Sequence, residues 1–195
     1  MIYLLGGPMR VGKSLIARRF RERASISVIS TDDISRVLRD RAPHLGITYE
    51  MPIAKECEAL WPFIRALISI RLDRDEPLLI EGAGISPRRA AQAQQEFVGG
   101  VRACFVGELT VRPQLKLRML IAYSETHGDW LAGKPSETYK ETVRTIRAVS
   151  EEYKRDCGVL GIAFFDMGEN FDESVAAVVE YLVTGEARPQ PRTSE

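Results

Sequence analysis

The sequence has few cysteines, only two histidines and no excess of charge of either sign. Cys57, Cys104 and Cys157 lie far apart and form no Cys-x-x-Cys pair, which argues against a disulfide framework or a zinc site and fits a reducing compartment. His44 and His127 lack the spacing of a metal-binding pair and are interpreted as surface residues. The 27 Lys and Arg residues balance 27 Asp and Glu residues, so no global field attracts nucleic acid or an anionic membrane. Any anion that the chain binds must be held by local groups.

Long apolar runs are also missing. No stretch approaches the roughly 20 apolar residues of a membrane span, and the run Met1 to Leu5 is too short for the core of a signal peptide. We therefore expect a cytoplasmic protein with no membrane partner. The 195 residues, 45% of them hydrophobic, suit one globular domain over residues 1–184. The last eleven residues, GEARPQPRTSE, have no large apolar side chain and are predicted to be a disordered tail over 185–195.

Short runs rich in Ile, Val and Leu alternate with longer stretches whose apolar residues recur at helical spacing. This pattern predicts an α/β fold with a parallel sheet flanked by helices. The strand runs are nearly all apolar, so both faces of the sheet should be covered. Five strands are predicted, at about 2–6, 26–30, 78–81, 101–106 and 162–165.

Several helices can be placed from the same spacing. One is predicted over about 53–72, where Pro62 would kink the helix or begin a new one. Another is predicted over 138–156. A final helix follows Asn170, whose Asn-x-x-Glu pattern with Glu173 resembles a capping box.

The strongest chemical signal directly follows the first predicted strand. The segment matches G-x-x-x-x-G-K-S/T without a mismatch and leads into a helix that should open near Lys13. In such a loop the glycines let backbone N–H groups converge on phosphates, Lys13 reaches the β and γ oxygens, and Ser14 ligates Mg²⁺. The sequence therefore predicts a site for a nucleotide and Mg²⁺, made of Gly7, Pro8, Met9, Arg10, Val11, Gly12, Lys13, Ser14 and Leu15.

Switch GTPases, ATP-driven motors and kinases all use such a loop. The sequence has no Asn-Lys-x-Asp segment to bind guanine and no Asp-x-x-Gly at the end of the third predicted strand, which argues against a GTPase. A motor would need more chain for its additional domains. A compact ATP-dependent kinase that phosphorylates an alcohol group fits the length.

Two aspartates, Asp32 and Asp33, follow the second predicted strand. The carboxyl ends of parallel strands meet at the edge where the phosphate-binding loop also opens. A kinase needs a carboxylate there to orient the acceptor hydroxyl or accept its proton. We assign this role to Asp32, with Asp33 as the second candidate. The alternative is that either residue only caps a helix predicted over 34–40.

Three further residues extend the predicted acceptor side. Arg36 and Arg39 are three residues apart on one helix face and either bind an anionic group of the acceptor or form a solvated basic surface. Glu81 ends the apolar strand LLIEG, where phosphate-loop enzymes place an acidic residue that holds Mg²⁺ through water. We predict that role for Glu81, the alternative being a strand-end glutamate without one. Together these residues favour a small, anionic acceptor.

The segments GGPMRVGKS, ISTDDISRVLR, LLIEGAGISP and YKETVRTIR carry a family resemblance. The chain resembles the small-molecule branch of the phosphate-loop kinases, which have the nucleoside-monophosphate-kinase-like fold. Within that branch it is most similar to 2-phosphoglycerate kinase and related AAA-like kinases. The resemblance implies the sheet order 2-3-1-4-5, the cofactors ATP and Mg²⁺, and the acceptor-side role of Asp32. It also implies that Arg39 and Arg147 lie near the phosphates and that the turn 166–170 lies beside adenine.

A helical lid is predicted over about residues 112–135. Gly128 and Gly133 permit hinge motion, and Lys134 could meet the phosphates on closure. The alternatives for that contact are Arg112, Lys116 and Arg118, and a solvated surface position is the alternative for each basic residue.

Two other functions stay open at this point. One is a kinase for a nucleotide or a polynucleotide 5′ end, which Trp130 and the basic segment 18–23 could serve, although the zero net charge disfavours it. The other is a nucleotide-binding regulatory or toxin-like module with little turnover.

Overall fold

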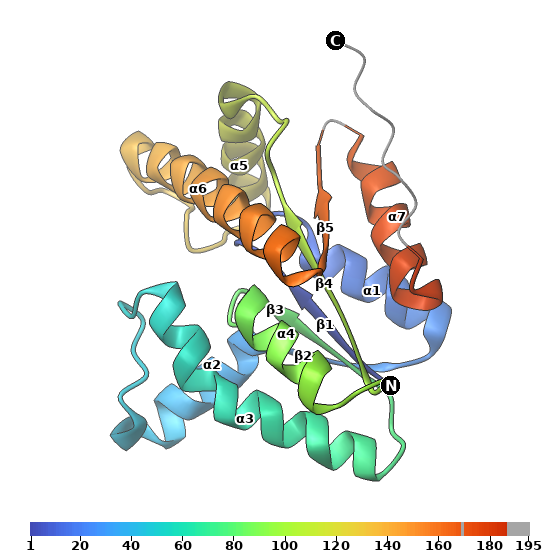
Figure 1. Ribbon diagram of the computed structural model, residues 1–195. Helices are drawn as coiled ribbons and strands as arrows, with labels where there is room; N and C mark the ends of the chain where they lie inside the picture. The colour runs from blue at the N-terminus through green and yellow to red at the C-terminus, as the bar shows by residue number, and fades with distance from the viewer. Residues whose placement is uncertain (169, 187–195) are drawn as a thin grey trace.

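The structure is a computed structural model that describes residues 1–168 and 170–186. Its described residues form one five-stranded sheet in the order β2-β3-β1-β4-β5 (Figure 1). All neighbouring strands are parallel. This confirms the predicted α/β class and the predicted strand order. The strands are β1 (Ile2–Gly6), β2 (Ser27–Ser30), β3 (Leu78–Gly82), β4 (Val101–Gly107) and β5 (Ala163–Asp166).

Helices connect the strands and cover both faces of the sheet (Figure 1). Those of the described chain are α1 (Lys13–Ala24), α2 (Thr31–Arg41), α3 (Ile53–Asp73), α4 (Pro87–Glu96), α5 (Pro113–His127), α6 (Ser136–Leu160) and α7 (Phe171–Thr184), with the short 3₁₀ helix η1 (Pro43–Leu45) after α2. No helix of residues 1–168 and 170–186 is long and apolar enough to cross a membrane.

The two faces of the sheet belong to two separate apolar cores, because neighbouring residues of a strand point to opposite faces. Leu4 of β1 lies in one core with Leu60 of α3. Leu5 lies in the other core with Ile16 of α1 and Val178 of α7. All of these side chains are fully buried. The faces are therefore filled with apolar side chains, and polar groups gather where the strands end.

A new helix at Pro62 and a capping box at Asn170 are the two local expectations that the structure contradicts. Pro62 lies inside the continuous helix α3 and does not begin a new one, since a proline removes a single backbone hydrogen bond and buried Leu60 and Ile64 hold the helix on the sheet. At α7, Asn170 occupies the N-cap position but its side chain caps no backbone N–H. Its amide instead donates to the Glu173 carboxylate at 3.2 Å. Residues 187–195 of the predicted tail lie outside the described residues.

Candidate functional site

The phosphate-binding loop joins β1 to α1 and needs glycine at two positions. Gly7 has φ +150°, and a Cβ there would lie 2.4 Å from the Val106 carbonyl oxygen. Gly12, the N-cap of α1, has φ +93°, and a Cβ there would lie 2.6 Å from Cζ of Phe171. No acidic residue occupies the first turn of α1. The open N-terminus of this helix therefore presents its amides and positive dipole to an anion.

Lys13 lies at the bottom of this loop. Its side chain is buried, with the residue 8% exposed, and its ammonium donates to the Pro8 carbonyl oxygen at 2.6 Å. Burial lowers the pKa of Lys13 to about 8, while the carboxylates of Glu81 and Asp32 act in the opposite direction. The ammonium is thus still protonated at neutral pH. Because Glu81 and Asp32 both act on this ammonium, the loop, the end of β3 and the start of α2 lie close together.

Glu81 reaches the loop from the neighbouring strand β3. Ser14 donates to Oε1 of Glu81 at 3.5 Å, and Glu81 is 7% exposed. Burial raises the pKa of the Glu81 carboxyl and Asp32 raises it further, whereas Lys13 and hydrogen bonds from Ser14 and Ser30 lower it. A cation bound beside this carboxylate would stabilise its charged form.

The residues present fit a magnesium ion. A hydroxyl and a carboxylate are hard oxygen ligands of the kind that Mg²⁺ prefers, and Ser14 and Glu81 supply one of each at the mouth of the loop. No group of three His, Cys, Asp or Glu side chains that could hold a metal occurs among residues 1–168 and 170–186. An ion at Ser14 and Glu81 would therefore take its other ligands from phosphates and water, as Mg²⁺ commonly does.

A close contact between β3 and α2 brings the acceptor side to the loop. Gly82 has φ +149°, and a Cβ there would lie 1.8 Å from the Thr31 hydroxyl. The same hydroxyl accepts a hydrogen bond from the Gly84 amide at 3.1 Å. Glycine at position 82 thus lets the first turn of α2 lie directly against the end of β3, beside Glu81.

Asp32 and Asp33 both lie in the first turn of α2 and both are exposed. The N-cap is Ser30, whose hydroxyl accepts a hydrogen bond from the Asp32 amide at 3.2 Å. The alternative that one of the aspartates caps this helix is therefore wrong, because the helix begins at Thr31 and not at Ile34. Both carboxylates are left available to a ligand, and Asp32 is the one that acts electrostatically on both Lys13 and Glu81.

The two arginines of α2 have different surroundings. Arg39 donates to the Ser35 hydroxyl at 2.7 Å, lies 3.6 Å from the Glu56 carboxylate and stacks over the Tyr49 ring at 4.0 Å. Ser35 in turn donates to Glu56. Arg36 is exposed, and no ion pair of its side chain is found within the described part of the chain. Arg39 therefore already has an internal counterion, whereas Arg36 is accessible to a ligand.

Arg147, which the resemblance places near the phosphates, lies on α6. Its Nε donates to Glu151 at 3.2 Å, in an exposed i, i+4 pair. Within residues 1–168 and 170–186 no hydrogen bond or ion pair joins Arg147 to the phosphate-binding loop. A role at the phosphates thus stays a prediction for this residue.

The predicted lid corresponds to α5 and the connection 128–135, which leads into α6. Lys134 is exposed, as are Arg112 and Arg118. The connection already contacts the phosphate-binding loop, because the Arg10 guanidinium pairs with Asp129. Arg10 also lies over the Tyr123 ring of α5, 4.8 Å from its centroid.

Sequence reasoning missed a buried ion pair beside the loop, formed by Glu108 and Lys116. The surface interpretation of Lys116 is wrong, since the residue is 6% exposed. One signal was present: Glu108 directly follows the apolar run of β4, much as Glu81 ends that of β3. The contact of Arg10 with Asp129 joins residues 119 positions apart and has no counterpart in the sequence pattern.

Comparison with known proteins gives a likeness at the level of the fold. No protein-family model and no curated protein matched the chain. A shikimate kinase from Bacteroides thetaiotaomicron has a TM-score of 0.55 and 14% identity, over 94% of this chain and 98% of that one. A gluconokinase from Sinorhizobium meliloti 1021 has a TM-score of 0.53 and 18% identity, over 94% and 96%. An uncharacterized protein from Eubacterium ventriosum ATCC 27560 has a TM-score of 0.53 and 14% identity, over 94% and 98%. The chain thus shares its fold with kinases of small molecules.

Proposed function

We propose that this chain is a kinase that transfers the terminal phosphate of ATP to a hydroxyl group of a small, anionic metabolite. The observation that carries the proposal is the meeting of Lys13, Glu81 and Asp32 at one edge of the sheet, where the two carboxylates act on the buried ammonium. A phosphate-binding loop alone would suit many enzymes. An exposed aspartate beside it is what a hydroxyl acceptor requires.

The phosphate side of the site, which consists of the loop and Glu81, would bind ATP and neutralise its charge. The amides of the loop and the Lys13 ammonium would bind the β and γ phosphates, and Ser14 and Glu81 would hold Mg²⁺. The bound ion would neutralise charge on the phosphates. Because Lys13 is buried, its charge acts in a medium of low dielectric constant, where it stabilises the negative charge of the transferring group more strongly than it would in water.

Asp32 is proposed to act on the acceptor. Its carboxylate would accept a hydrogen bond from the reacting hydroxyl, orient the oxygen toward the terminal phosphate and take the proton as the bond to phosphorus forms. Asp33 is its neighbour in the same helical turn and is the second candidate. The role needs an accessible carboxylate, and both residues are exposed.

The acceptor is proposed to carry a negative charge. Arg36 offers an accessible guanidinium one helical turn beyond Asp32. Arg39 would also bind an anionic acceptor if that anion displaced the Glu56 carboxylate, which lies 3.6 Å from the Arg39 guanidinium. The neighbours in fold are named for shikimate and gluconate, both hydroxy acids, and the sequence resemblance suggests 2-phosphoglycerate. A hydroxylated carboxylate or phosphate ester is thus the acceptor class to test first.

Two further predicted roles, one from the resemblance and one from the sequence pattern, belong to the same proposal. Arg147 would have to leave Glu151 to reach the phosphates, and the segment 112–135 would act as a lid over them. The Arg147→Ala variant should then lower the rate of transfer and leave the affinity for the acceptor unchanged.

An assay of ADP release tests the function. ATP and Mg²⁺ are supplied with 2-phosphoglycerate, shikimate or gluconate, and in parallel with glycerol, adenosine and an oligonucleotide that has a 5′-hydroxyl. We expect release that depends on an anionic acceptor and is lost in the Lys13→Ala variant. Release that depends only on the oligonucleotide would favour a polynucleotide kinase. Release that no acceptor increases would favour a regulatory module.

A further inference from the structure

The ammonium of Lys116 lies close to three oxygen atoms. It lies 3.0 Å from Oε1 and 2.7 Å from Oε2 of Glu108, and 2.6 Å from the carbonyl oxygen of Arg10. A lysine ammonium has three N–H donors and no acceptor. Two of these donors are used in hydrogen bonds to Oε1 of Glu108 and to the Arg10 carbonyl, so Lys116 of α5 connects the end of β4 to the middle of the phosphate-binding loop.

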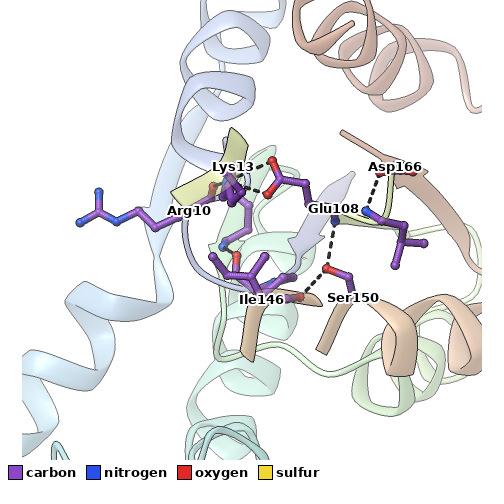
Figure 2. Close-up of polar contacts among 9 residues, drawn as sticks. Arg10, Lys13, Glu108, Ile146, Ser150 and Asp166 are labelled. Atoms are coloured by element: carbon purple, nitrogen blue, oxygen red, sulfur yellow. Dashed lines mark hydrogen bonds and ion pairs between the residues drawn. The ribbon is translucent and has the colours of Figure 1, made fainter. Parts of the chain in front are cut away.

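Glu108 is itself held from two directions. Its backbone amide donates to the Ser150 hydroxyl at 2.9 Å, and that hydroxyl donates to the Ile146 carbonyl of α6 at 2.6 Å. The next amide, of Leu109, donates to Asp166 at the end of β5 at 2.9 Å. Figure 2 shows Glu108 between Arg10 and Lys13 of the loop on one side and Asp166 and Ser150 on the other. The backbone at Glu108 is therefore attached to both α6 and β5.

The loop needs such support at Arg10. This residue has φ +62°, a left-handed conformation that is unfavourable for a non-glycine residue. Its carbonyl belongs to the peptide bond whose N–H is that of Val11. In a trans peptide the C=O and the N–H point in opposite directions. A hydrogen bond that fixes the Arg10 carbonyl on the side of Lys116 thus also fixes the direction of the Val11 N–H.

We propose that Lys116, held in place by Glu108, is a positioning residue that orients the Arg10–Val11 peptide so that its N–H donates to the bound phosphates. The inference rests on the proposed binding of ATP at this loop but not on transfer to any acceptor. Lys116 contacts the loop through the Arg10 carbonyl oxygen, so its proposed effect on bound phosphates is exerted through the backbone. The contact of Lys116 with the Arg10 carbonyl gives a reason for a charged pair in a buried place, where two apolar side chains would pack at a lower desolvation cost.

The double variant Lys116→Met/Glu108→Leu distinguishes a loss of loop positioning from a loss of overall protein stability. Replacing a buried ion pair by apolar residues of similar size is often neutral for stability or stabilising, whereas the Arg10 carbonyl loses its donor. Binding is measured by calorimetry with ATP, with tripolyphosphate and with adenosine, and the melting temperature is recorded for each protein. We expect affinity for ATP and tripolyphosphate to fall by roughly tenfold or more, with adenosine binding and melting temperature unchanged.

The control is Lys140→Met, which removes an exposed lysine of α6 and should change none of these values. If the double variant does not fold, Lys116→Met/Glu108→Gln replaces it, because an uncharged amide of nearly the same size leaves no unpaired charge buried. Wild-type affinity for tripolyphosphate in either variant would overturn the positioning role, as would an equal loss for adenosine and ATP. Absence of ATP binding to the wild-type chain would instead overturn the proposed function.

Discussion

The two sides of the candidate site are built differently. On the phosphate side the charged groups are buried, since Lys13, Glu81 and Lys116 are only 6–8% exposed, and each has a partner in the fold. On the acceptor side Asp32 and Arg36 are exposed at the surface of α2. A buried, preorganised group loses little freedom when its ligand arrives. If the proposed function is correct, selection among acceptors falls to the exposed acceptor side.

The acceptor side also carries its own internal counterions. Arg39, Ser35 and Glu56 form a cluster between α2 and α3, covered by Tyr49. These groups are joined to one another rather than to the loop. The comparison therefore predicts that substitutions on the phosphate side affect binding and transfer together, whereas substitutions on the acceptor side affect one substrate only.

The largest effect is expected for Lys13→Ala. Within the loop segment 7–15 the only other cation is Arg10, which is paired with Asp129, so no side chain of the loop replaces the lost charge between the β and γ phosphates. We expect transfer to fall by at least about a hundredfold, as for other preorganised electrostatic groups, and ATP affinity to fall with it. Steady-state kinetics and calorimetry measure the two quantities. Activity within tenfold of the parent would refute the role of the loop.

The Asp32→Asn variant should affect phosphate transfer but not ATP binding, and so distinguish the roles of the two sides. The amide keeps the shape of the side chain but cannot accept a proton at neutral pH, so transfer should fall by roughly a hundredfold or more while ATP binds nearly as before. Asp33→Asn should reduce transfer less. Turnover and ATP affinity are measured for both variants. A fully active Asp32→Asn protein beside an inactive Asp33→Asn protein would reverse the two assignments.

The charge of the acceptor can be tested at Arg36, Arg39 and Glu56. Loss of a charge-assisted hydrogen bond in Arg36→Ala or Arg39→Ala should raise the KM for an anionic acceptor by roughly tenfold or more, with the KM for ATP unchanged. Glu56→Gln removes the counterion of Arg39 and should lower the acceptor KM. Parent-like acceptor kinetics in both arginine variants would exclude these two residues from the acceptor site.

The smallest effect concerns pH. Burial lowers the pKa of Lys13 to about 8, so the free protein loses this charge as the pH rises through that value. ATP affinity should therefore decline by a few-fold between about pH 7 and about pH 9. Lys13→Arg stays charged over this range and serves as the control: its affinity, although lower, should not change with pH. A flat profile for the wild-type protein would contradict the lowered pKa.

The sequence predicted the features that depend on residues close to one another in the chain. The loop, Gly7 to Leu15, is contiguous, and the apolar runs placed the ends of all five strands within one residue of those observed. Glu81 could be predicted because it ends such a run. Helix boundaries were less certain, because Ser30 and Asp32 are both good N-caps and only the end of β2 decides between them.

The remaining features depend on contacts between distant segments. Lys116 is an ordinary basic residue of a helix until Glu108 and the Arg10 carbonyl are brought to it. The pairing of Arg39 with Glu56, and that of Arg10 with Asp129, likewise cross between elements that no periodicity connects. Burial and pairing of charged side chains are tertiary properties, which is why the acceptor side was predicted only as a group of candidates.

Phosphorus NMR of the reaction mixture is the most direct test of the central claim, that the buried loop and the exposed aspartate act together in phosphate transfer. ATP, Mg²⁺ and each anionic acceptor are incubated with the wild-type, Asp32→Asn and Lys13→Ala proteins. The account predicts a new phosphoester signal, formed together with ADP, for the wild-type protein and at least one acceptor. That signal should be absent in both variants, although Asp32→Asn still binds ATP. Formation of inorganic phosphate alone with every acceptor, or a phosphoester signal of undiminished intensity in Asp32→Asn, would contradict it.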